Sequence, residues 1–215
     1  MKIDGHATRN TVTLLSIYGK GVFMRRVLFI LSLVAFAAWG MAGCKPGLLP
    51  SGDAGKPKVS LERVEIMRFV PWTELPAPTL LPLGFVFVVE NPSEYSIKLE
   101  NFKFAVSFEA PGSGQYMVLS TATTYDTMVF APRSVSRYRV VDILDSGAVW
   151  RSLMLPNRAK VDALKLDPKE LTKTWYTTIG DFPFGIMASE GMAVFSSESV
   201  KGDIFVPFEG NFPKK

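Results

Sequence analysis

Residues 83–89 (LGFVFVV) and residues 102–108 (FKFAVSF) decide the fold. The first segment is a short continuous apolar run, which is typical of a strand in the centre of a β-sandwich. In the second segment, apolar residues alternate with Lys103, Ala105 and Ser107, which is the period of a half-buried strand. Two such segments, close together in the chain, predict a protein built mainly from strands around one hydrophobic core.

Further strand patterns lie on both sides of these two segments. Before them, Val59 and Leu61 alternate, and Val64 and Ile66 alternate in the opposite phase, which predicts a strand with a β-bulge. After them, residues 111–114 (PGSG) predict a turn. Strands are also expected at residues 116–124, 126–130, 134–141, 191–196 and 203–208.

Two helices are expected among the later strands. Asp145 or Ser146 can cap a short helix that runs to Leu155 and stops at Pro156-Asn157. The resulting pattern, about eight short strands with two peripheral helices, predicts an all-β fold of the immunoglobulin or fibronectin type III-like β-sandwich class.

The second helix carries the clearer signals. Asp167 suits the N-cap, Pro168 suits the first helical position and Glu170 suits the third. Gly180 is the expected end. One face of this helix repeats every four residues, with Leu171, Trp175 and Ile179.

The N-terminal part has the pattern of an export signal. Arg25 and Arg26 precede an apolar run at residues 27–39 (VLFILSLVAFAAW), and small residues follow. A basic start, an apolar run of about 7–15 residues and a small-residue end define a secretory signal peptide. We therefore expect residues 24–43 to be a signal peptide, with an uncleaved membrane anchor as the alternative. Residues 1–23 are then a mis-assigned N-terminal extension, and translation is expected to begin at Met24.

Met41-Ala42-Gly43-Cys44 resembles the lipobox of bacterial lipoproteins. In that family the Cys is acylated and becomes the mature N-terminus, so the resemblance implies a lipid on Cys44; a free surface thiol is the alternative. Lys45 is not the acidic residue associated with inner-membrane retention, which favours the periplasmic face of the outer membrane. Residues 44–57 hold this Cys and a segment rich in Gly and Pro, which we expect to be a flexible tether.

The net positive charge of the chain comes from the residues before Cys44. The formal net charge is +4, from 24 Lys and Arg against 20 Asp and Glu. Five of the basic residues and one of the acidic residues precede Cys44, which leaves 19 of each in the mature chain. The basic balance therefore gives no argument for binding nucleic acid.

The mature chain also lacks the side chains that most often carry catalysis. His6, the only His, precedes Cys44, so neither an imidazole nor a free thiol remains. No set of metal ligands and no Gly-rich phosphate loop is present, and we expect neither a metal, a cofactor nor an enzyme.

Two pairs of carboxylates remain as candidates for acid–base chemistry. Asp142 and Asp145 stand near an expected helix start, where acidic side chains interact favourably with the helix dipole. Glu62 and Glu65 fit the solvated face of the first strand. We therefore interpret both pairs as structural.

Several segments in order along the chain resemble the WHy domain, the water-stress and hypersensitive-response module of group 2 late embryogenesis abundant proteins. They are Val89-Glu90-Asn91-Pro92, with Ser93 in place of the second Asn of the family's NPN pattern, residues 131–134 (APRS) and residues 202–208 (GDIFVPF). The resemblance covers most of residues 59–209. It implies a β-sandwich, no catalytic residues and a role in stress protection or partner binding. We assign residues 58–210 to this domain and residues 211–215 to a tail; residues 148–185 are longer and more helical than in the family.

The Asn91-Pro92 motif can also be explained physically, without reference to the WHy domain. Pro92 lacks an N–H and pushes Asn91 to an extended conformation, so the central strand is expected to stop there. The Asn91 amide can then satisfy nearby backbone groups, and we interpret the motif as structural.

Two groups of residues are candidates for binding. Arg133, Arg137 and Arg139 could bind anionic headgroups, or they could form an exposed face paired with acids. Trp150, Trp175 and residues 182–184 (FPF) could line an apolar cleft or a partner surface, or they could cover the core.

These observations predict a membrane-anchored lipoprotein with a non-enzymatic β-sandwich that acts in binding or stress protection. The alternative is a carrier or sensor of an apolar ligand, such as a lipid, in a cleft lined by the helices. The expected partners are the membrane, through Cys44, and an unidentified protein.

Overall fold

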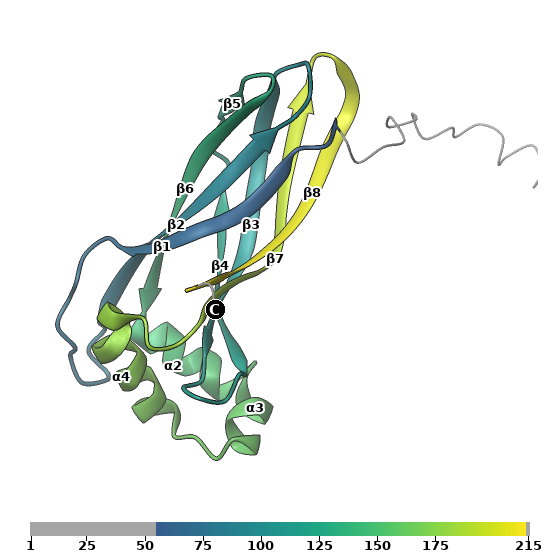
Figure 1. Ribbon diagram of the computed structural model, residues 1–215. Coiled ribbons are helices and arrows are strands. Elements are labelled where there is room, and N and C mark those ends of the chain that lie inside the picture. The colour runs from purple at the N-terminus through teal and green to yellow at the C-terminus, as the bar shows by residue number, and fades with distance from the viewer. Residues whose placement is uncertain (1–54, 214–215) are drawn as a thin grey trace, which may run out of the picture. The chain divides into compact units, whose positions relative to one another are not determined.

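The computed structural model describes residues 55–213, which lie in one compact unit, Pro50–Lys215. Eight strands form two antiparallel sheets in this part of the chain (Figure 1). The first sheet has the order β1-β2-β6 and consists of β1 (Lys58–Ile66), β2 (Leu80–Asn91) and β6 (Ser134–Asp145). The second has the order β4-β3-β7-β8, with β3 (Ile97–Glu109), β4 (Tyr116–Thr124), β7 (Ile186–Ser197) and β8 (Val200–Phe212). The short β5 (Val129–Phe130) pairs with β3.

Three helices and one 3-10 turn accompany the sheets. They are α2 (Ser146–Met154), α3 (Arg158–Ala163), α4 (Pro168–Thr178) and η2 (Ile179–Asp181), and all lie at one end of the sandwich (Figure 1). The predicted all-β sandwich with peripheral helices is therefore confirmed. The hydrophobic core is formed by residues of this unit, so it meets the condition for a domain that folds on its own.

The predicted N-terminal extension, signal peptide and lipobox, with Met41, Ala42, Gly43 and Cys44, lie outside the described residues, as does most of the predicted tether. Among residues 55–213, no helix has the length and apolar character needed to cross a membrane.

Phenylalanine rings fill the space between the two sheets. Phe85 and Phe87 of β2 face Phe102 and Phe104 of β3, and all four are at most 1% exposed. The rings of Phe87 and Phe102 meet edge to face with centroids 4.9 Å apart, and those of Phe85 and Phe104 with centroids 5.0 Å apart. Phe208 of β8 stacks on Phe102 at 4.7 Å. Such pairs contribute about 0.5–1.5 kcal/mol each beyond the burial of their area.

The β-bulge predicted in the first strand is confirmed, because the pairing of β1 with β2 shifts register between Leu61 and Arg63. The prediction that β3 is half-buried is correct only for its first half. Ala105 and Ser107 are buried; Ser107 pairs with Val118 of β4, to which the helical region is joined through Asn157.

Several strand ends differ from the prediction. β6, β7 and β8 are longer than expected, whereas residues 126–130 contribute only the two residues of β5. Phe212 belongs to β8 and packs on Phe182 with ring centroids 5.0 Å apart. The domain therefore includes Phe212, and the prediction of a tail from residue 211 is wrong for the first two residues.

Both predicted helix starts are confirmed. Asp145 caps α2 by accepting a hydrogen bond from the Ala148 amide at 2.9 Å. Asp167 caps α4 by accepting from the amides of Lys169 at 2.8 Å and Glu170 at 2.9 Å.

Two features of the helical region were not predicted correctly. The six-residue α3 buries only Val161, so its sequence shows no apolar period. Gly180 does not end the helical segment: the chain continues through η2, and the left-handed residue that turns it is Phe182, with φ of 45°.

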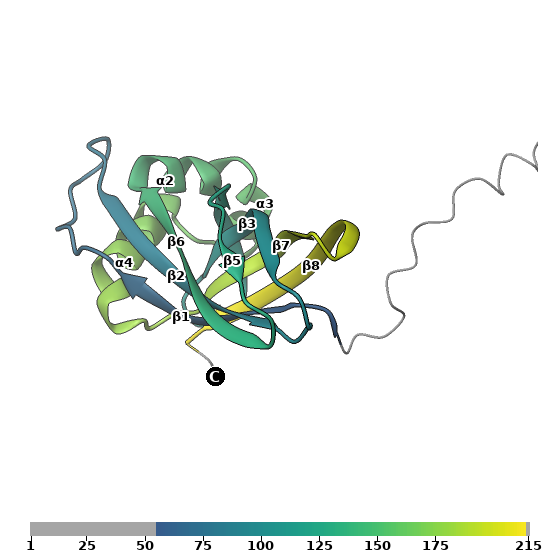
Figure 2. The same cartoon turned by 90° about the horizontal axis from the view of Figure 1, so that it is seen from above.

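The first and last strands close one side of the sandwich. β1 and β8 lie side by side in both views (Figures 1 and 2). A Cβ atom on Gly210 of β8 would lie 2.4 Å from Leu61 Cβ, so only glycine permits this approach.

The chain enters the sandwich at the end opposite the helices (Figure 1). Lys58 pairs with Glu90, whereas α2 follows the pair of Leu80 with Asp145. The two positions are ten residues apart on β2, or about 33 Å. We call these the entry end and the helical end.

Asn91 ties three backbone segments together at the entry end. Its side chain is 1% exposed, and its amide group donates to the carbonyl oxygens of Tyr95 and Ala131, each at 2.9 Å. Its Oδ1 atom accepts from the Ser93 amide at 3.2 Å. The amide therefore satisfies backbone groups after β2 and before β6, as the sequence predicts for this motif.

We expect Asn91→Ala to lower the free energy of unfolding by about 2–4 kcal/mol, because the substitution leaves buried carbonyl groups without donors. Pro92→Ala, at the adjacent exposed position, should lower it by less than about 1 kcal/mol. Urea unfolding followed by tryptophan fluorescence measures both changes. Equal effects of the two substitutions would contradict the structural role of Asn91.

Candidate functional site

The start of α2 is fixed by a reciprocal pair of buried hydrogen bonds. The Thr79 amide donates to Ser146 Oγ at 2.9 Å, and the Ser146 amide donates to the Thr79 carbonyl oxygen at 3.0 Å. Both residues are at most 1% exposed. The pair extends the hydrogen bonding between β2 and β6 by one residue and holds α2 at the end of the first sheet.

The β1–β2 loop, residues 67–79, is joined to α4. Trp72 meets the ring of Tyr176 edge to face at 5.6 Å, and Glu74 accepts from Lys173 Nζ at 2.9 Å. Tyr176 also donates its hydroxyl to the Leu144 carbonyl oxygen at 2.9 Å. The loop, α4 and β6 are thus held as one group.

Trp175 belongs to the core. It is 0% exposed, its indole N–H donates to the Glu109 carbonyl oxygen at 2.9 Å, and its ring packs against Phe108 and Phe184. Of the two interpretations of the aromatic residues, covering the core is correct for Trp175 and Phe184. Phe182 is half-buried against Phe212.

Asn157 attaches the helices to an edge strand. Its side-chain amide donates to the Val118 carbonyl oxygen at 2.7 Å, and its Oδ1 atom accepts from the Val118 amide at 3.2 Å. The side chain thus pairs with β4 as a neighbouring strand would. The sequence indicated only that Asn157 follows a helix, because a partner 39 residues away leaves no local signal.

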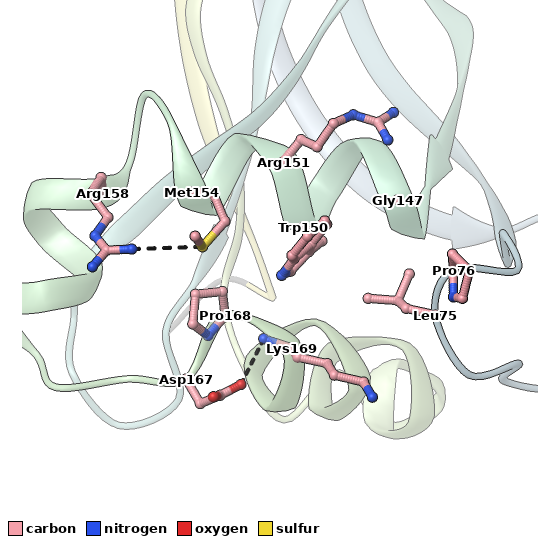
Figure 3. Close-up of a pocket in the computed structure, with 10 residues that line it drawn as sticks. All are labelled: Leu75, Pro76, Gly147, Trp150, Arg151, Met154, Arg158, Asp167, Pro168 and Lys169. Carbon is pink, nitrogen blue, oxygen red and sulfur yellow. Dashed lines mark hydrogen bonds between the residues drawn. The ribbon is translucent and has the colours of Figure 1, made fainter.

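A cleft of about 600 Å³ lies between these elements, which is within the range of about 300–1,000 Å³ seen for ligand sites (Figure 3). Trp150 extends from α2 toward the start of α4 and remains 37% exposed. The other lining residues from the loop, α2, α3 and α4 are Leu75, Pro76, Gly147, Arg151, Met154, Arg158, Asp167, Pro168 and Lys169. We call this the helical-end cleft. It brings together Trp150 with residues that the sequence did not single out as binding residues.

The charged lining of the helical-end cleft is mainly basic. Within residues 55–213, no carboxylate lies at ion-pair distance from Arg151. Arg158 pairs with Asp162 at 2.8 Å and Lys169 with Glu74 at 3.6 Å, and both pairs are exposed. The one lining carboxylate, Asp167, already accepts two amides at the start of α4.

The structure pairs the three arginines of the predicted anion site with acids. Arg133 contacts Glu94, Arg137 contacts Glu62 at 2.7 Å and Arg139 contacts Glu65 at 2.7 Å. An anion at any of them would compete with these carboxylates, so the arrangement favours the interpretation as an exposed, ion-paired face.

The candidate carboxylate pairs have structural partners as well. Asp142 accepts from Ser120 Oγ at 2.5 Å, and Asp145 caps α2. Within residues 55–213, no three potential metal-binding side chains come together. Glu109, a buried acid that the sequence did not reveal, accepts from the amides of Gly185 at 2.9 Å and Gly114 at 3.1 Å.

The outer face of the first sheet carries a second surface that the sequence did not reveal. Gly84 pairs with Val141 and Pro82 with Ile143, and Met67 lies over Gly84. Val141 and Ile143 are 50% and 58% exposed, on a strand whose inward residues are buried. This apolar strip is distinct from the helical-end cleft.

Comparison with known proteins identifies no family. No family model matches the chain, and no curated protein matches it. Among solved structures, a crystal structure of a protein from Archaeoglobus fulgidus is 12% identical, covering 72% of this chain and 98% of that chain with a TM-score of 0.37. An X-ray structure of a Northeast Structural Genomics Consortium target is 13% identical, covering 74% and 89% with a TM-score of 0.38. Neither description states a function.

Burial raises the pKa of Tyr176 well above its usual value of 10.0. The folded state therefore holds this proton more tightly than the unfolded state, and the stabilisation is lost as the pH rises past 10. We expect the free energy of unfolding to fall more steeply between about pH 9 and pH 11 in the wild type than in Tyr176→Phe.

Tyr138 and Lys173 also have raised pKa values. Both residues are present in the wild type and in Tyr176→Phe, so the difference between the two pH curves reports on Tyr176. At neutral pH, Tyr176→Phe should be less stable by about 1 kcal/mol, through the lost hydrogen bond to Leu144. Tyr125→Phe, at a side chain that is 73% exposed, is the matched control. Parallel pH curves for wild type and Tyr176→Phe, measured by chemical denaturation, would show that the buried hydroxyl has no such effect.

Proposed function

We propose that this protein is an exported lipoprotein, anchored through acylated Cys44 to the periplasmic face of a bacterial outer membrane, and that its β-sandwich is a non-enzymatic binding module. The observation that supports this most is the separation of the entry end from the helical end by about 33 Å. The described part of the chain begins at the entry end, so attachment there leaves the helical-end cleft unobstructed.

The side chains of the sandwich support a binding role rather than catalysis. The candidate acids act as helix caps or ion-pair partners, as Asp145 and Glu65 do. By contrast, the helical-end cleft leaves the indole of Trp150 37% exposed, and Arg151 of its lining has no carboxylate at ion-pair distance among residues 55–213. Exposed apolar groups in a concave site favour the binding of a partner.

From the resemblance to the WHy module, we further propose that this binding acts in stress protection. If so, the chain from Lys45 onward should preserve a reporter enzyme through drying better than an equal mass of an unrelated β-sandwich protein.

The second candidate function is a carrier or sensor of an apolar ligand, and the cleft beside Trp150 is the observation that favours it. Native mass spectrometry of the protein from cells would then show a bound lipid.

Anchoring is tested with a clickable palmitate analogue in cells. We expect the wild type to incorporate the label and to sediment with outer membranes, and Cys44→Ser to lose both properties. Lys45→Asp should keep the label but move to the inner membrane. Membrane sedimentation of Cys44→Ser at the wild-type level would contradict acylation as the anchor.

The position of the binding surface is tested with a photo-crosslinking amino acid. We expect adducts when it replaces Trp150 at the helical end, and none when it replaces Val135, which is 69% exposed near the entry end. Adducts confined to residue 135, or adducts at neither position, would contradict a binding role for the helical end.

A further inference from the structure

We propose that the free edge of β6, at residues 138–144, binds an extended segment of another polypeptide, which pairs with β6 and adds a strand to the three-stranded first sheet. The added strand carries apolar side chains on the face that it shares with Val141 and Ile143, and polar side chains without carboxylates on the other face. This surface is separate from the helical-end cleft, so the inference goes beyond the proposed function.

Alternate residues of β6 direct their backbone groups away from β2. In an antiparallel pair, the amide and carbonyl groups of every second residue face the neighbouring strand. The Ser146 amide donates to the Thr79 carbonyl oxygen, and the register along β6 is uninterrupted, so the even-numbered residues of β6 face β2. The amide and carbonyl groups of Arg139, Val141 and Ile143 therefore point toward the free edge of the sheet.

The other sheet edges have partners along part of their length, whereas this stretch of β6 has none in the described part of the chain. β1 and β8 lie side by side, and Asn157 and Lys160 bond to the backbone of β4 (Figure 1). β6 pairs only with β2, and no residue among 55–213 bonds to the backbone groups of Arg139, Val141 or Ile143. The open stretch lies between β5, which contacts β6 near the entry end, and α2 at the helical end.

The side chains of this stretch do not protect the edge. Edge strands are commonly protected by Lys, by Pro or by a β-bulge. Residues 138–144 contain no Lys or Pro, and their pairing with β2 has no register shift. Arg139, the one cation of the stretch, extends over β2 to reach Glu65 of β1 at 2.7 Å and so lies away from the edge.

An extended polypeptide is the ligand whose chemistry matches such an edge. The free donors and acceptors recur at every second residue, about 6.6–6.8 Å apart, which is the repeat of another β-strand. Strand addition of this kind obtains its affinity from main-chain hydrogen bonds and its specificity from alternate side chains.

The two faces of β6 select the side chains of the added strand. Val141 and Ile143 are 50% and 58% exposed on the outer face, where apolar cross-strand neighbours are favourable. On the inner face, Asp142 accepts from Ser120 Oγ of β4 at 2.5 Å. A carboxylate placed opposite Asp142 would be repelled, whereas Lys, Ser or Thr would be accepted. The added strand therefore alternates apolar residues with neutral polar or basic ones.

A second copy of this chain fits the edge less well. If two β6 strands pair antiparallel with Val141 of each opposite Ile143 of the other, the two copies of Asp142 lie opposite one another. If Val141 lies opposite Val141, Ile143 meets Arg139 instead of an apolar residue. Like charges directly opposite are destabilising, so these registers favour a different polypeptide.

Amide exchange tests whether the edge is open in the protein alone. In NMR measurements on residues 45–215, the amides of Arg139, Val141 and Ile143 should exchange at least about tenfold faster than those of Val140 and Asp142, which face β2. Equal rates at odd and even positions would contradict an open edge. Protection of the odd positions that rises with protein concentration would show a second copy there and would overturn the inference.

The chemistry of the partner is tested by selecting phage-displayed random peptides of about nine residues on the wild type and on Val141→Pro. Proline removes an amide hydrogen that does not donate to β2, so the variant should keep the first sheet, which circular dichroism checks. We expect peptides enriched only on the wild type to alternate apolar residues with neutral polar or basic ones. Val135→Pro makes the same change outside the open stretch and should retain these peptides.

N-methylated copies of the selected peptides distinguish backbone pairing from docking by side chains alone. Methyl groups on the amides of the apolar residues, which face β6, should weaken binding to the wild type by about tenfold or more. Methyl groups on the intervening amides, which face away from β6, should change the affinity by less than about twofold. Because both peptides are measured on the wild type, the comparison does not depend on the folding of a variant.

Three results of the peptide experiments would overturn the inference: no enrichment specific to the wild type, enriched peptides without the alternation, or equal effects of the two methylation patterns. None of them affects palmitate labelling or crosslinking at Trp150. Failure of strand addition at β6 is therefore distinguishable from failure of the proposed function.

Discussion

The contact between phenylalanine rings of the two sheets is the interaction on which the rest of the structure depends. Phe85 and Phe87 can meet Phe102 and Phe104 only if each strand keeps one register, because a shift of one residue would turn every ring toward solvent. At the helical end the apolar layer continues through Phe108 to Trp175, and α4 covers it. Since the interior is occupied by side chains, a partner has to be bound on the outside, where the loop and helices form a concave surface.

Much of the fold could be predicted because its signals are local. The change of phase between Leu61 and Val64 revealed the bulge, and Asp167 with Pro168 revealed the start of α4. The helix α3 was not predicted, because a single buried residue, Val161, makes no apolar period. The burial of Ala105 and Ser107 was not predicted, because the alternation of a strand does not show whether both of its faces are covered.

The candidate site could be predicted only in part, because three distant segments build it. The sequence offered Trp150 and Trp175 together as residues of a cleft or of a core cover, yet one lines the helical-end cleft and the other is enclosed between Phe108 and Phe184. The basic residues around Trp150 carried no signal, since ordinary exposed helix faces have the same composition. Nor could the sequence show that Arg137 and Arg139 lie opposite Glu62 and Glu65, about 75 positions away.

The attachment of Asn157 to Val118 has a consequence for the behaviour of many copies together. β4 is the edge of its sheet, and open edges can nucleate pairing between molecules and so begin aggregation. The Asn157 amide takes up the Val118 backbone groups, and Lys160 donates to the Tyr116 carbonyl oxygen at 2.8 Å. Molecules confined to a two-dimensional surface, as a lipid anchor would confine them, meet one another often. Asn157 and Lys160 thus occupy backbone groups of this sheet edge and make edge-to-edge aggregation of crowded molecules less favourable.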